Sequence, residues 1–436
     1  MTWKSSELSE IAEYIGRGSS PVYDDESATP VLNQACIQHG RLDLSRLKFI
    51  SEAHFGSLGE QKKTRRGDVF VNSTGTGTLG RIAYWDSDTE IAYDGHVTLV
   101  RLSPEHEPKF FYYLLQTPAI QTQILNNCIS GSTNQVELSR EPFRRVQLRH
   151  PATRQEQAAI AEILTTVDQA IAQTEALIAK QRRIKAGLLH DLLTRGIDEA
   201  GRLRDPATHR FKPTAVGLAP VEWEVRTIGE MASFVGSGVT PTGGSNVYGQ
   251  EGIIFIRSQN VYNDGLVLDD VAYIDAPTNQ RMQRSQVFSH DVLLNITGAS
   301  IGRCCFVPDE FPAANVNQHV CIIRLPDATR TDALYLSAFL ASPFGQRHVK
   351  LLNAGGNREG LNYQQVKSIV VAYPVEQDER DRFAELMLAI NESIRVENER
   401  REKLLRLKSG LMQDLLTGRV AVVGFLNATE GRSDAA

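Results

Sequence analysis

The sequence predicts an α+β protein built from two tandem copies of one α/β fold, each followed by a long α-helix. Three observations predict this class. The helical stretch 155–197 recurs as 378–420 at a constant offset of 223 residues, so that KAGLLHDLLT returns as KSGLMQDLLT. A globular stretch with one common order of motifs precedes each copy. Both helices carry apolar residues at a spacing of three and four, which is typical of a coiled-coil seam. We therefore expect the helices to pair as an antiparallel coiled coil with pseudo-two-fold symmetry.

The length and composition are those of a soluble chain of several domains. At 436 residues, about two to four domains are expected. No run approaches the roughly 18 apolar residues of a membrane span, and the start, MTWKSSELSEIAEYIG, lacks the apolar core of a signal peptide. A cytoplasmic location is expected.

The cysteines and the net charge exclude some classes of site. Five cysteines without a C-x-x-C pair favour buried free thiols over a disulfide framework or a zinc site. The net charge of -5 argues against a protein that coats nucleic acid nonspecifically. It does not exclude a protein that reads DNA with basic residues gathered on one face, because the local field decides.

The two globular halves repeat the same elements in the same order. GDVFVNSTGTGTLGRIAY in the first half is answered by HDVLLNITGASIGRCCFV in the second, and both are expected to form strands joined by a turn. VTLVRL is expected to be a strand, and residues 110–125 carry helix-like spacing. The 223-residue offset also relates Asp68 to Asp291, His96 to His319, Leu138 to Leu361 and Pro151 to Pro374.

These repeats divide the chain into six expected segments. The globular halves are 1–150 and 221–375, and the helices are 151–197 and 376–420. Residues 198–220, rich in charge, Gly and Pro with little periodicity, are expected to be a linker, and 421–436 a polar tail.

Each helix is expected to present a seam of about 3.5-residue period. About 40 residues at roughly 1.5 Å each predict a rod near 60 Å long, which a small domain cannot cover. One intramolecular pair would hold the two globular halves at a fixed separation; packing along the neighbouring domain and homodimerisation are the alternatives. The expected seam positions are Ile160, Ile163, Val167, Ile171, Thr174, Ile178, Gln181, Ile184 and Leu188 in the first helix, and Phe383, Met387, Ile390, Ile394, Glu397, Arg401, Leu404, Lys408 and Leu411 in the second.

No motif in the sequence predicts an active site. Gly75, Gly77 and Gly80 match the dinucleotide pattern G-x-G-x-x-G, but strand-like RIAYWD follows where a helix is needed to face the pyrophosphate. A tight turn between two strands explains this stretch and its copy. The phosphate-loop, H-E-x-x-H, G-x-S-x-G and [DNS]-P-P-[YFW] signatures are absent. His96 and His319 lack nearby metal-ligand partners and are expected to be packed or hydrogen-bonded.

Polar loops in equivalent places of the two halves are the candidate site. Asn, Gln, Arg, Ser and Thr read base edges in the major groove, and clusters of Lys and Arg hold phosphates. Ordinary solvated loops are the alternative for any single residue. The candidate DNA-binding residues are Lys62, Lys63, Arg65, Arg66, Ser73, Thr74, Thr76, Thr78, Arg81, Asn134, Gln135, Arg257, Ser258, Gln259, Asn260, Thr297, Ser300, Arg303, Asn357 and Arg358.

Taken together, these motifs resemble the specificity (S) subunits of Type I restriction-modification enzymes. The resemblance rests on the duplicated order, the two GDVFVNS-like and HDVLLNI-like runs, the proline-led helix starts and the KAGLLHDLLT and KSGLMQDLLT ends. It covers about residues 5–424. One departure is that Arg400 and Arg401 stand where Leu177 and Ile178 occur in the first helix.

The resemblance implies two target recognition domains, each reading one half of a bipartite double-stranded DNA target, with the helices setting the unread gap. It implies a non-catalytic subunit that recruits two DNA adenine methyltransferase subunits and the restriction/translocase subunits. S-adenosylmethionine, ATP and Mg are then expected on those partners and none on this chain. Two other hypotheses stay open: a coiled-coil adaptor with two protein-binding heads, and a nucleotide-dependent enzyme that uses GTGTLG.

Overall fold

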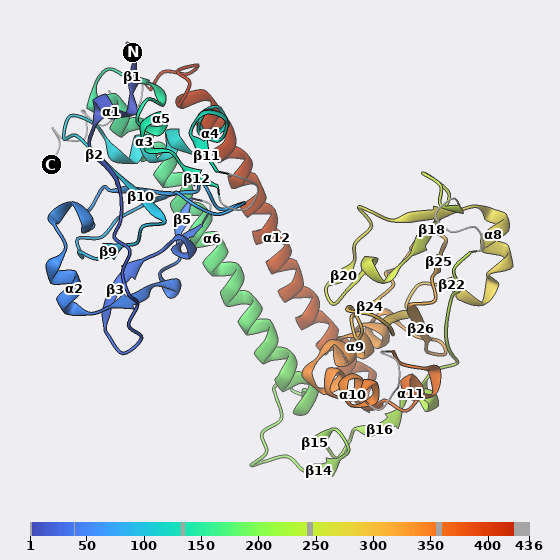
Figure 1. Cartoon of the computed structure of the whole chain (residues 1–436). Coiled ribbons are helices and arrows are strands. Elements are labelled where there is room, and N and C mark those ends of the chain that lie inside the picture. The colour runs from blue at the N-terminus through green and yellow to red at the C-terminus, as the bar shows by residue number, and fades with distance from the viewer. Residues whose placement is uncertain (1, 39, 132–135, 242–246, 355–359, 423–436) are drawn as a thin grey trace, which may run out of the picture. The chain divides into compact units, whose positions relative to one another are not determined.

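The computed structural model describes residues 2–422 except 39, 132–135, 242–246 and 355–359. Two compact units share the chain: unit 1 comprises Met1–Glu175 and Glu399–Ala436, and unit 2 comprises Ala176–Asn398. Each unit therefore contains one globular half and parts of both long helices, α6 (Arg154–Thr194) and α12 (Gln377–Leu415) (Figure 1). Of the tail expected at 421–436, residues 423–436 lie outside the described part.

Unit 1 is built on a four-stranded antiparallel sheet in the order β2-β10-β7-β8. A three-stranded sheet, β6-β3-β9, lies beside it, with β3 and β9 parallel. The strands are β1 (Trp3–Glu7), β2 (Ala12–Arg17), β3 (Thr29–Leu32), β4 (Ile37–Gln38), β5 (Arg41–Leu42), β6 (Lys48–Ile50), β7 (Val69–Asn72), β8 (Ile82–Tyr84), β9 (Ala92–Tyr93), β10 (Val97–Leu102), β11 (Ile129–Ser130), β12 (Glu137–Leu138) and β13 (Gln147–Pro151). The helices are α1 (Leu8–Ile11), α2 (Glu52–Ser57), α3 (Pro108–Leu115), α4 (Pro118–Asn127) and α5 (Arg140–Arg144).

Unit 2 repeats this arrangement with the sheet order β17-β26-β23-β24 and a second sheet, β21-β18-β25-β22, in which β18 and β25 are parallel. The strands are β14 (Phe211–Thr214), β15 (Gly217–Pro220), β16 (Glu224–Thr227), β17 (Phe234–Ser237), β18 (Ile253–Ile256), β19 (Val261–Tyr262), β20 (Gly265–Leu266), β21 (Ala272–Ile274), β22 (Gln286–Val287), β23 (Val292–Asn295), β24 (Cys304–Phe306), β25 (Ala314–Val316), β26 (Val320–Arg324) and β27 (Val370–Tyr373). The helices are α7 (Ile228–Met231), α8 (Ala276–Arg281), α9 (Arg330–Ala341), α10 (Pro343–Asn353) and α11 (Tyr363–Lys367). The matching sheet orders confirm the predicted duplication of one α+β fold.

The end of each long helix packs into the core of the globular half that precedes the other helix. In unit 1, Leu415 and Leu416 of the DLLT repeat join the core that contains Phe110 and Phe111. In unit 2 the corresponding Leu192 and Leu193 join the core of α9 and the start of α12. Burial of such leucines contributes about 2 kcal/mol each, so the repeated DLLT is a docking motif for a core.

The two long helices pair antiparallel in each unit, as the spacing predicts. In unit 1, Lys408 forms an ion pair with Asp168 at 2.6 Å. In unit 2, the amide of Gln181 donates to the hydroxyl of Ser393 at 2.7 Å. Val167, Ile171, Thr174 and Ile178 are buried in the seam.

One predicted seam position is wrong. The side chain of Ile184 is 49% exposed, because strict heptad spacing after Ile178 and Gln181 continues at Lys185, which is half-buried. The same spacing places Leu188 inward, where it packs against the core of unit 2.

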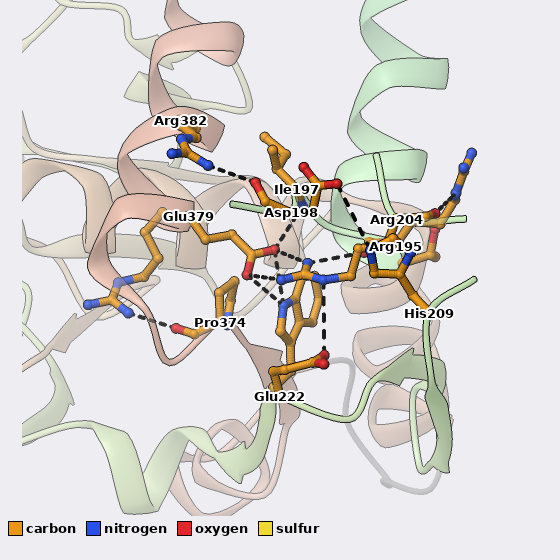
Figure 2. A network of polar contacts seen from close by, with 12 residues as sticks. Arg195, Ile197, Asp198, Arg204, His209, Glu222, Pro374, Glu379 and Arg382 are labelled. Atoms are coloured by element: carbon orange, nitrogen blue, oxygen red, sulfur yellow. Dashed lines mark hydrogen bonds and ion pairs between the residues drawn. The ribbon is translucent and has the colours of Figure 1, made fainter. Parts of the chain in front are cut away.

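The segment expected as a linker contains regular structure. β14 and β15 form an antiparallel hairpin, and Arg204 is 8% exposed. Figure 2 shows Arg204 and Glu379 at the centre of a polar network, in which their side chains form an ion pair at 2.5 Å. The connection in unit 2 is thus held to the first turn of α12.

Two further expectations concern cysteines and membrane spans. All five cysteines are buried free thiols, as predicted. Burial raises the pKa of Cys305 and Cys321 to about 12, so these thiols stay protonated at neutral pH. Among the described residues, none of the helices has the length and apolar character needed to cross a bilayer.

Candidate nucleic-acid interface

The glycine-rich loop of unit 1 is a turn between two paired strands. β7 and β8 are antiparallel neighbours, and Gly75, Gly77 and Gly80 take the positive φ values of 92°, 79° and 82° that close the turn. A strand, β8, follows the loop where the geometry for holding a pyrophosphate requires a helix N-terminus. The prediction of a tight turn is confirmed.

An asparagine at the end of the central strand fixes this loop in both units. The Asn72 backbone receives a hydrogen bond from Gly80 N at 2.9 Å, and its side-chain amide donates to the carbonyl of Gln34 at 3.1 Å. In unit 2, Asn295 receives one from Gly302 N at 2.8 Å and donates to the carbonyl of Ser258 at 2.8 Å. Both asparagine side chains are fully buried. The asparagine amide thus joins the turn to the loop after β3 in unit 1 and to the loop after β18 in unit 2.

A histidine and a threonine complete a hydrogen-bonded frame common to the two units. The frame consists of Asn72, Thr74 and His96 in unit 1 and of Asn295, Thr297 and His319 in unit 2. His96 Nδ1 lies 3.0 Å from the hydroxyl of Thr74, and His319 Nδ1 lies 2.5 Å from the hydroxyl of Thr297. The carbonyls of the two histidines also accept from Ser73 N and Ile296 N, at 2.8 and 3.0 Å. The expectation that these histidines are hydrogen-bonded is confirmed.

A further strand segment reaches the same place. Leu138 N donates to the carbonyl of Ser73 at 2.8 Å, and Leu361 N donates to the carbonyl of Ile296 at 2.8 Å. The backbone bridges Thr74–Glu137 and Thr297–Gly360 extend this contact. Three loops and one histidine thus meet at one edge of each sheet.

The asparagine, threonine and histidine side chains of the frame are the same in the two units, and the residues around them differ. Thr76 and Ala299, both exposed, occupy the tips of the two turns. Gln34 and Ser258 occupy equivalent places in the loop beside them. Because the frame is the same and the side chains around it differ, the two units present different hydrogen-bonding groups on one scaffold.

The structure brings together most of the predicted residues of the turns. Ser73, Thr74, Thr76, Thr78 and Arg81 share the turn of unit 1, and 257–260 lie beside Thr297, Ser300 and Arg303 in unit 2. Their chemistry is mixed. Among them Asn260 is only 2% exposed and donates to the carbonyl of Val267 at 3.0 Å, which is a structural role.

The two arginines of the second loop set are held by neighbours. The guanidinium of Arg257 lies 5.8 Å from the ring of Tyr248 and donates to the carbonyl of Asp270 at 3.1 Å. Arg303 stacks 4.7 Å from the ring of Tyr262. Such stacking orders a flexible side chain and leaves some of its donors available.

The basic cluster 62–66 is largely paired. Arg66 forms ion pairs with Asp86 and Asp88 at 2.5 and 2.8 Å, and the hydrogen bond and charge of Asp88 raise the pKa of Arg66 above its ordinary value. Lys63 and Arg65 both contact Glu60, at 3.2 and 3.5 Å. These carboxylates reduce the positive field that phosphates would meet.

Lys62 is engaged by the backbone. Its Nζ donates to the carbonyls of Arg17 and Gly18, and it lines a polar cavity of about 470 Å³ with Glu137. Four other predicted residues, Asn134, Gln135, Asn357 and Arg358, lie outside the described residues.

An ion pair with a buried aspartate supports the sheet in each unit. Arg101 holds Asp68 through two bonds of 2.8 and 2.7 Å, and Arg324 holds Asp291 through two bonds of 2.7 Å. Burial raises the pKa of Asp68 despite the opposing effect of Arg101. The constant offset of the two aspartates reflects this structural pair.

Sequence reasoning missed Gln34, which stands beside the turn of unit 1. The signal that identifies it is its alignment with Ser258 in the copy, because Ser258 belongs to a predicted DNA-binding loop. Within the described ranges, no group of three or more His, Cys, Asp or Glu side chains gathers in a metal-binding arrangement. The site offers neutral donors and acceptors together with the guanidinium groups of Arg81, Arg257 and Arg303, which suits recognition of base edges.

Comparisons with known proteins identify the family and the fold. The family described as the Type I restriction modification DNA specificity domain matches residues 1–181 and 220–406. The putative type I restriction enzyme MjaX specificity subunit of Methanocaldococcus jannaschii is 22% identical over 431 residues, which cover 96% of this chain and 94% of that protein. The type I restriction enzyme MjaVIII specificity subunit of the same organism is 21% identical over 329 residues, 74% of each chain.

Two solved structures share the fold. The S subunit of a type I restriction-modification system from M. genitalium superposes with a TM-score of 0.60 at 15% identity, covering 95% of this chain and 96% of that one. A chain from a study of complex assembly and conformational transition in the type I R-M system superposes with a TM-score of 0.54 at 14% identity, covering 95% and 97%. With the family matched over both halves of the sequence, the chain belongs to the type I restriction-modification DNA specificity family and is a specificity subunit of such a system.

Proposed function

We propose that this subunit reads a bipartite, asymmetric DNA target, one half with residues 1–150 and the other with 221–375. Subunits of this family are non-catalytic and recognise DNA for methyltransferase and restriction partners. The observation that carries the bipartite reading is the common frame of Asn72 and Asn295, which presents different side chains in each unit. A coiled-coil adaptor that binds proteins alone is not favoured, because the family match covers both halves.

The DNA contacts are proposed at the turns and the loops beside them. The proposed contacts are Thr76, Thr78 and Arg81 in the first half, and Arg257, Ser258, Gln259, Ser300 and Arg303 in the second. Ser73 is fully buried, and the hydroxyls of Thr74 and Thr297 are engaged by His96 and His319, so these three residues are left out. Direct contacts to base edges supply specificity, whereas phosphate contacts supply most of the affinity. With a net charge of -5 and its 62–66 cluster paired, the subunit is expected to bind DNA weakly outside the complex.

Two equivalent grooves support the recruitment of two identical partners. In unit 1, Met412 of α12 and Pro118 at the start of α4 line an apolar groove of about 780 Å³. In unit 2, Leu189 of α6 and Pro343 at the start of α10 line one of about 350 Å³. We propose that each groove takes one adenine methyltransferase subunit, which carries S-adenosylmethionine, while ATP and Mg act on the restriction subunits. This assembly would work in the cytoplasm, where the DNA is.

The docking proposal has a matched pair of variants. A buried charge without a partner is costly, so Met412→Glu and Leu189→Glu are each expected to remove one of two co-purifying methyltransferase subunits, and the double variant both. The stoichiometry is measured by native mass spectrometry. If the double variant still binds two methyltransferase subunits, the grooves are not their binding sites.

The target proposal is tested by mapping N6-methyladenine in cells that express this chain with its methyltransferase. Two short specific blocks separated by a gap of fixed length are the expected result. A continuous palindrome contradicts the bipartite reading, and an absence of any footprint of the assembled complex on DNA supports the adaptor.

A further inference from the structure

Gln34 begins a short 3-10 helix, Gln34–Cys36, whose backbone is held firmly. The capping residue, Asn33, is 4% exposed; its side chain accepts from Ala35 N at 2.8 Å and donates to the carbonyl of Arg46 at 2.8 Å. The carbonyl of Gln34 itself accepts from Asn72. The position of this residue at the edge of the turn is therefore set by the frame.

The side chain of Gln34 is also oriented. Its Oε1 accepts a hydrogen bond from the hydroxyl of Thr74 at 3.0 Å. Because that hydroxyl has one hydrogen, the Thr74 oxygen must accept from Nδ1–H of His96, 3.0 Å away. The pair of bonds turns the oxygen of the carboxamide toward the loop and its NH₂ group away from it.

The NH₂ group of Gln34 has no acceptor among the residues that the structure describes, and the side chain is partly exposed. Its Oε1 keeps a second lone pair. An ordered donor beside an acceptor matches the N7 acceptor and N6 amino donor of adenine in the major groove. Since the rotamer is already fixed, little conformational freedom is lost on binding.

The copy in unit 2 presents a different group on the same frame. Asn295 donates to the carbonyl of Ser258, and Thr297 keeps its bond to His319. There Nε2 of His319 accepts from the side chain of Gln318 at 2.8 Å. A residue that differs between the units at a position the frame holds constant is suited to distinguish two half-sites.

We infer that Gln34 reads an adenine of the first half-site, that Thr74 and His96 are the positioning residues that orient it, and that Ser258 is its counterpart in the second half-site. This inference rests on the proposed bipartite target. It adds Gln34 to the proposed contacts and gives it a specific base.

The test maps the methylation motif of the full chain with its methyltransferase. Gln34→Glu keeps the acceptor for Thr74 and replaces the NH₂ donor. One adenine of the first half-site is then expected to lose its preference by about tenfold to a hundredfold, with cytosine gaining, because a carboxylate accepts from the cytosine amino group. Gln34→Ser is expected to make the same position degenerate. The second half-site should stay unchanged in both variants.

The positioning role has its own readout. Thr74→Val is expected to relax the same single position, and Thr74→Ser to restore it, whereas a merely structural role would affect all positions together. Ala35→Ser, at the exposed neighbour, is the control and should leave the motif unchanged.

The outcomes separate this inference from the proposed function. An unchanged motif in both Gln34 variants overturns the inference and leaves the bipartite reading in place, as does a change at a position without adenine on either strand. Loss of all methylation in both variants also overturns it, because Gln34 then serves the fold of the loop. A wild-type motif that is not bipartite rejects the proposed function itself.

Discussion

Truncation of Glu379 to alanine should open the connection between α6 and the second globular half. The carboxylate accepts two hydrogen bonds from Arg204 at 2.5 and 2.9 Å, and others from Trp223 Nε1 at 3.1 Å and Ile197 N at 2.8 Å (Figure 2). Glu379 is 6% exposed and Trp223 is 1% exposed. One side chain therefore satisfies donors from the residues just after α6, from the connection and from the residue before β16.

The magnitude follows from what the truncation leaves behind. A buried guanidinium without its partner costs about 3–5 kcal/mol, and each unsatisfied N–H adds about 1–3 kcal/mol. These contributions are not additive, so we expect a local loss of at least about 3 kcal/mol. Because 1.4 kcal/mol is a factor of about ten, amide exchange around Ile197 should accelerate by more than about a hundredfold. Glu379→Gln, which keeps one acceptor, should have a smaller effect.

Hydrogen exchange followed by mass spectrometry measures this locally, which suits a chain of two units better than one melting temperature. Peptides covering β10 of unit 1 serve as the internal reference. Glu385→Ala, exposed on the same helix, is the matched control. Exchange near Ile197 within about threefold of wild type in Glu379→Ala, or equal acceleration in the control, would refute the reasoning.

Three other outcomes are expected. Burial alone would raise the pKa of Asp332, but its hydrogen bonds, first that from Tyr373 at 2.6 Å, lower this pKa below its ordinary value. The ionised carboxylate therefore stabilises unit 2 fully above about pH 4, and this stabilisation is lost as the pH falls through the folded pKa. Asp332→Asn should flatten that pH dependence in acid denaturation. Inserting one helical turn near Gln181 and one at its partner position on α12 should change the gap between half-sites and neither half, as methylation mapping will show; an unchanged gap removes the spacing role. In a double-mutant cycle, Asp68→Ala and Arg101→Ala should each destabilise unit 1 by about 3–5 kcal/mol with strong coupling in denaturant unfolding; additive effects would contradict the pairing.

The duplication was predictable because the same residue types recur at a fixed offset along the sequence. Asn72 and Asn295 stand at one offset, and the structure gives them the same hydrogen bonds. The strands and the tight turn also follow from local patterns of apolar residues and glycines. By contrast, the meeting of Gln34 with Thr74 joins residues 40 positions apart that follow β3 and β7, strands of two different sheets. Periodicity within a segment contains no information about such a contact.

The charges and the connection show a second limit of sequence reasoning. The run KKTRR predicts that Arg66 binds phosphate, yet Arg66 is paired with Asp86 and Asp88, which follow β8 on the other strand of the hairpin. Arg204 reads as one charge in a polar linker, yet it is buried against Glu379. Composition counts charges, whereas the fold decides which of them are neutralised.

The placement of the turns and of the helix ends explains how recognition and assembly can vary separately. The tip of the turn at Thr76 is exposed, and its frame is closed by hydrogen bonds within the loops, so a new side chain there disturbs no core. The groove beside Met412 is instead built on the same helix end that places Leu415 and Leu416 in the core of unit 1. Substitutions at the tips should therefore alter the proposed target and leave the groove intact, whereas loss of a helix end would remove both a partner's groove and part of a core.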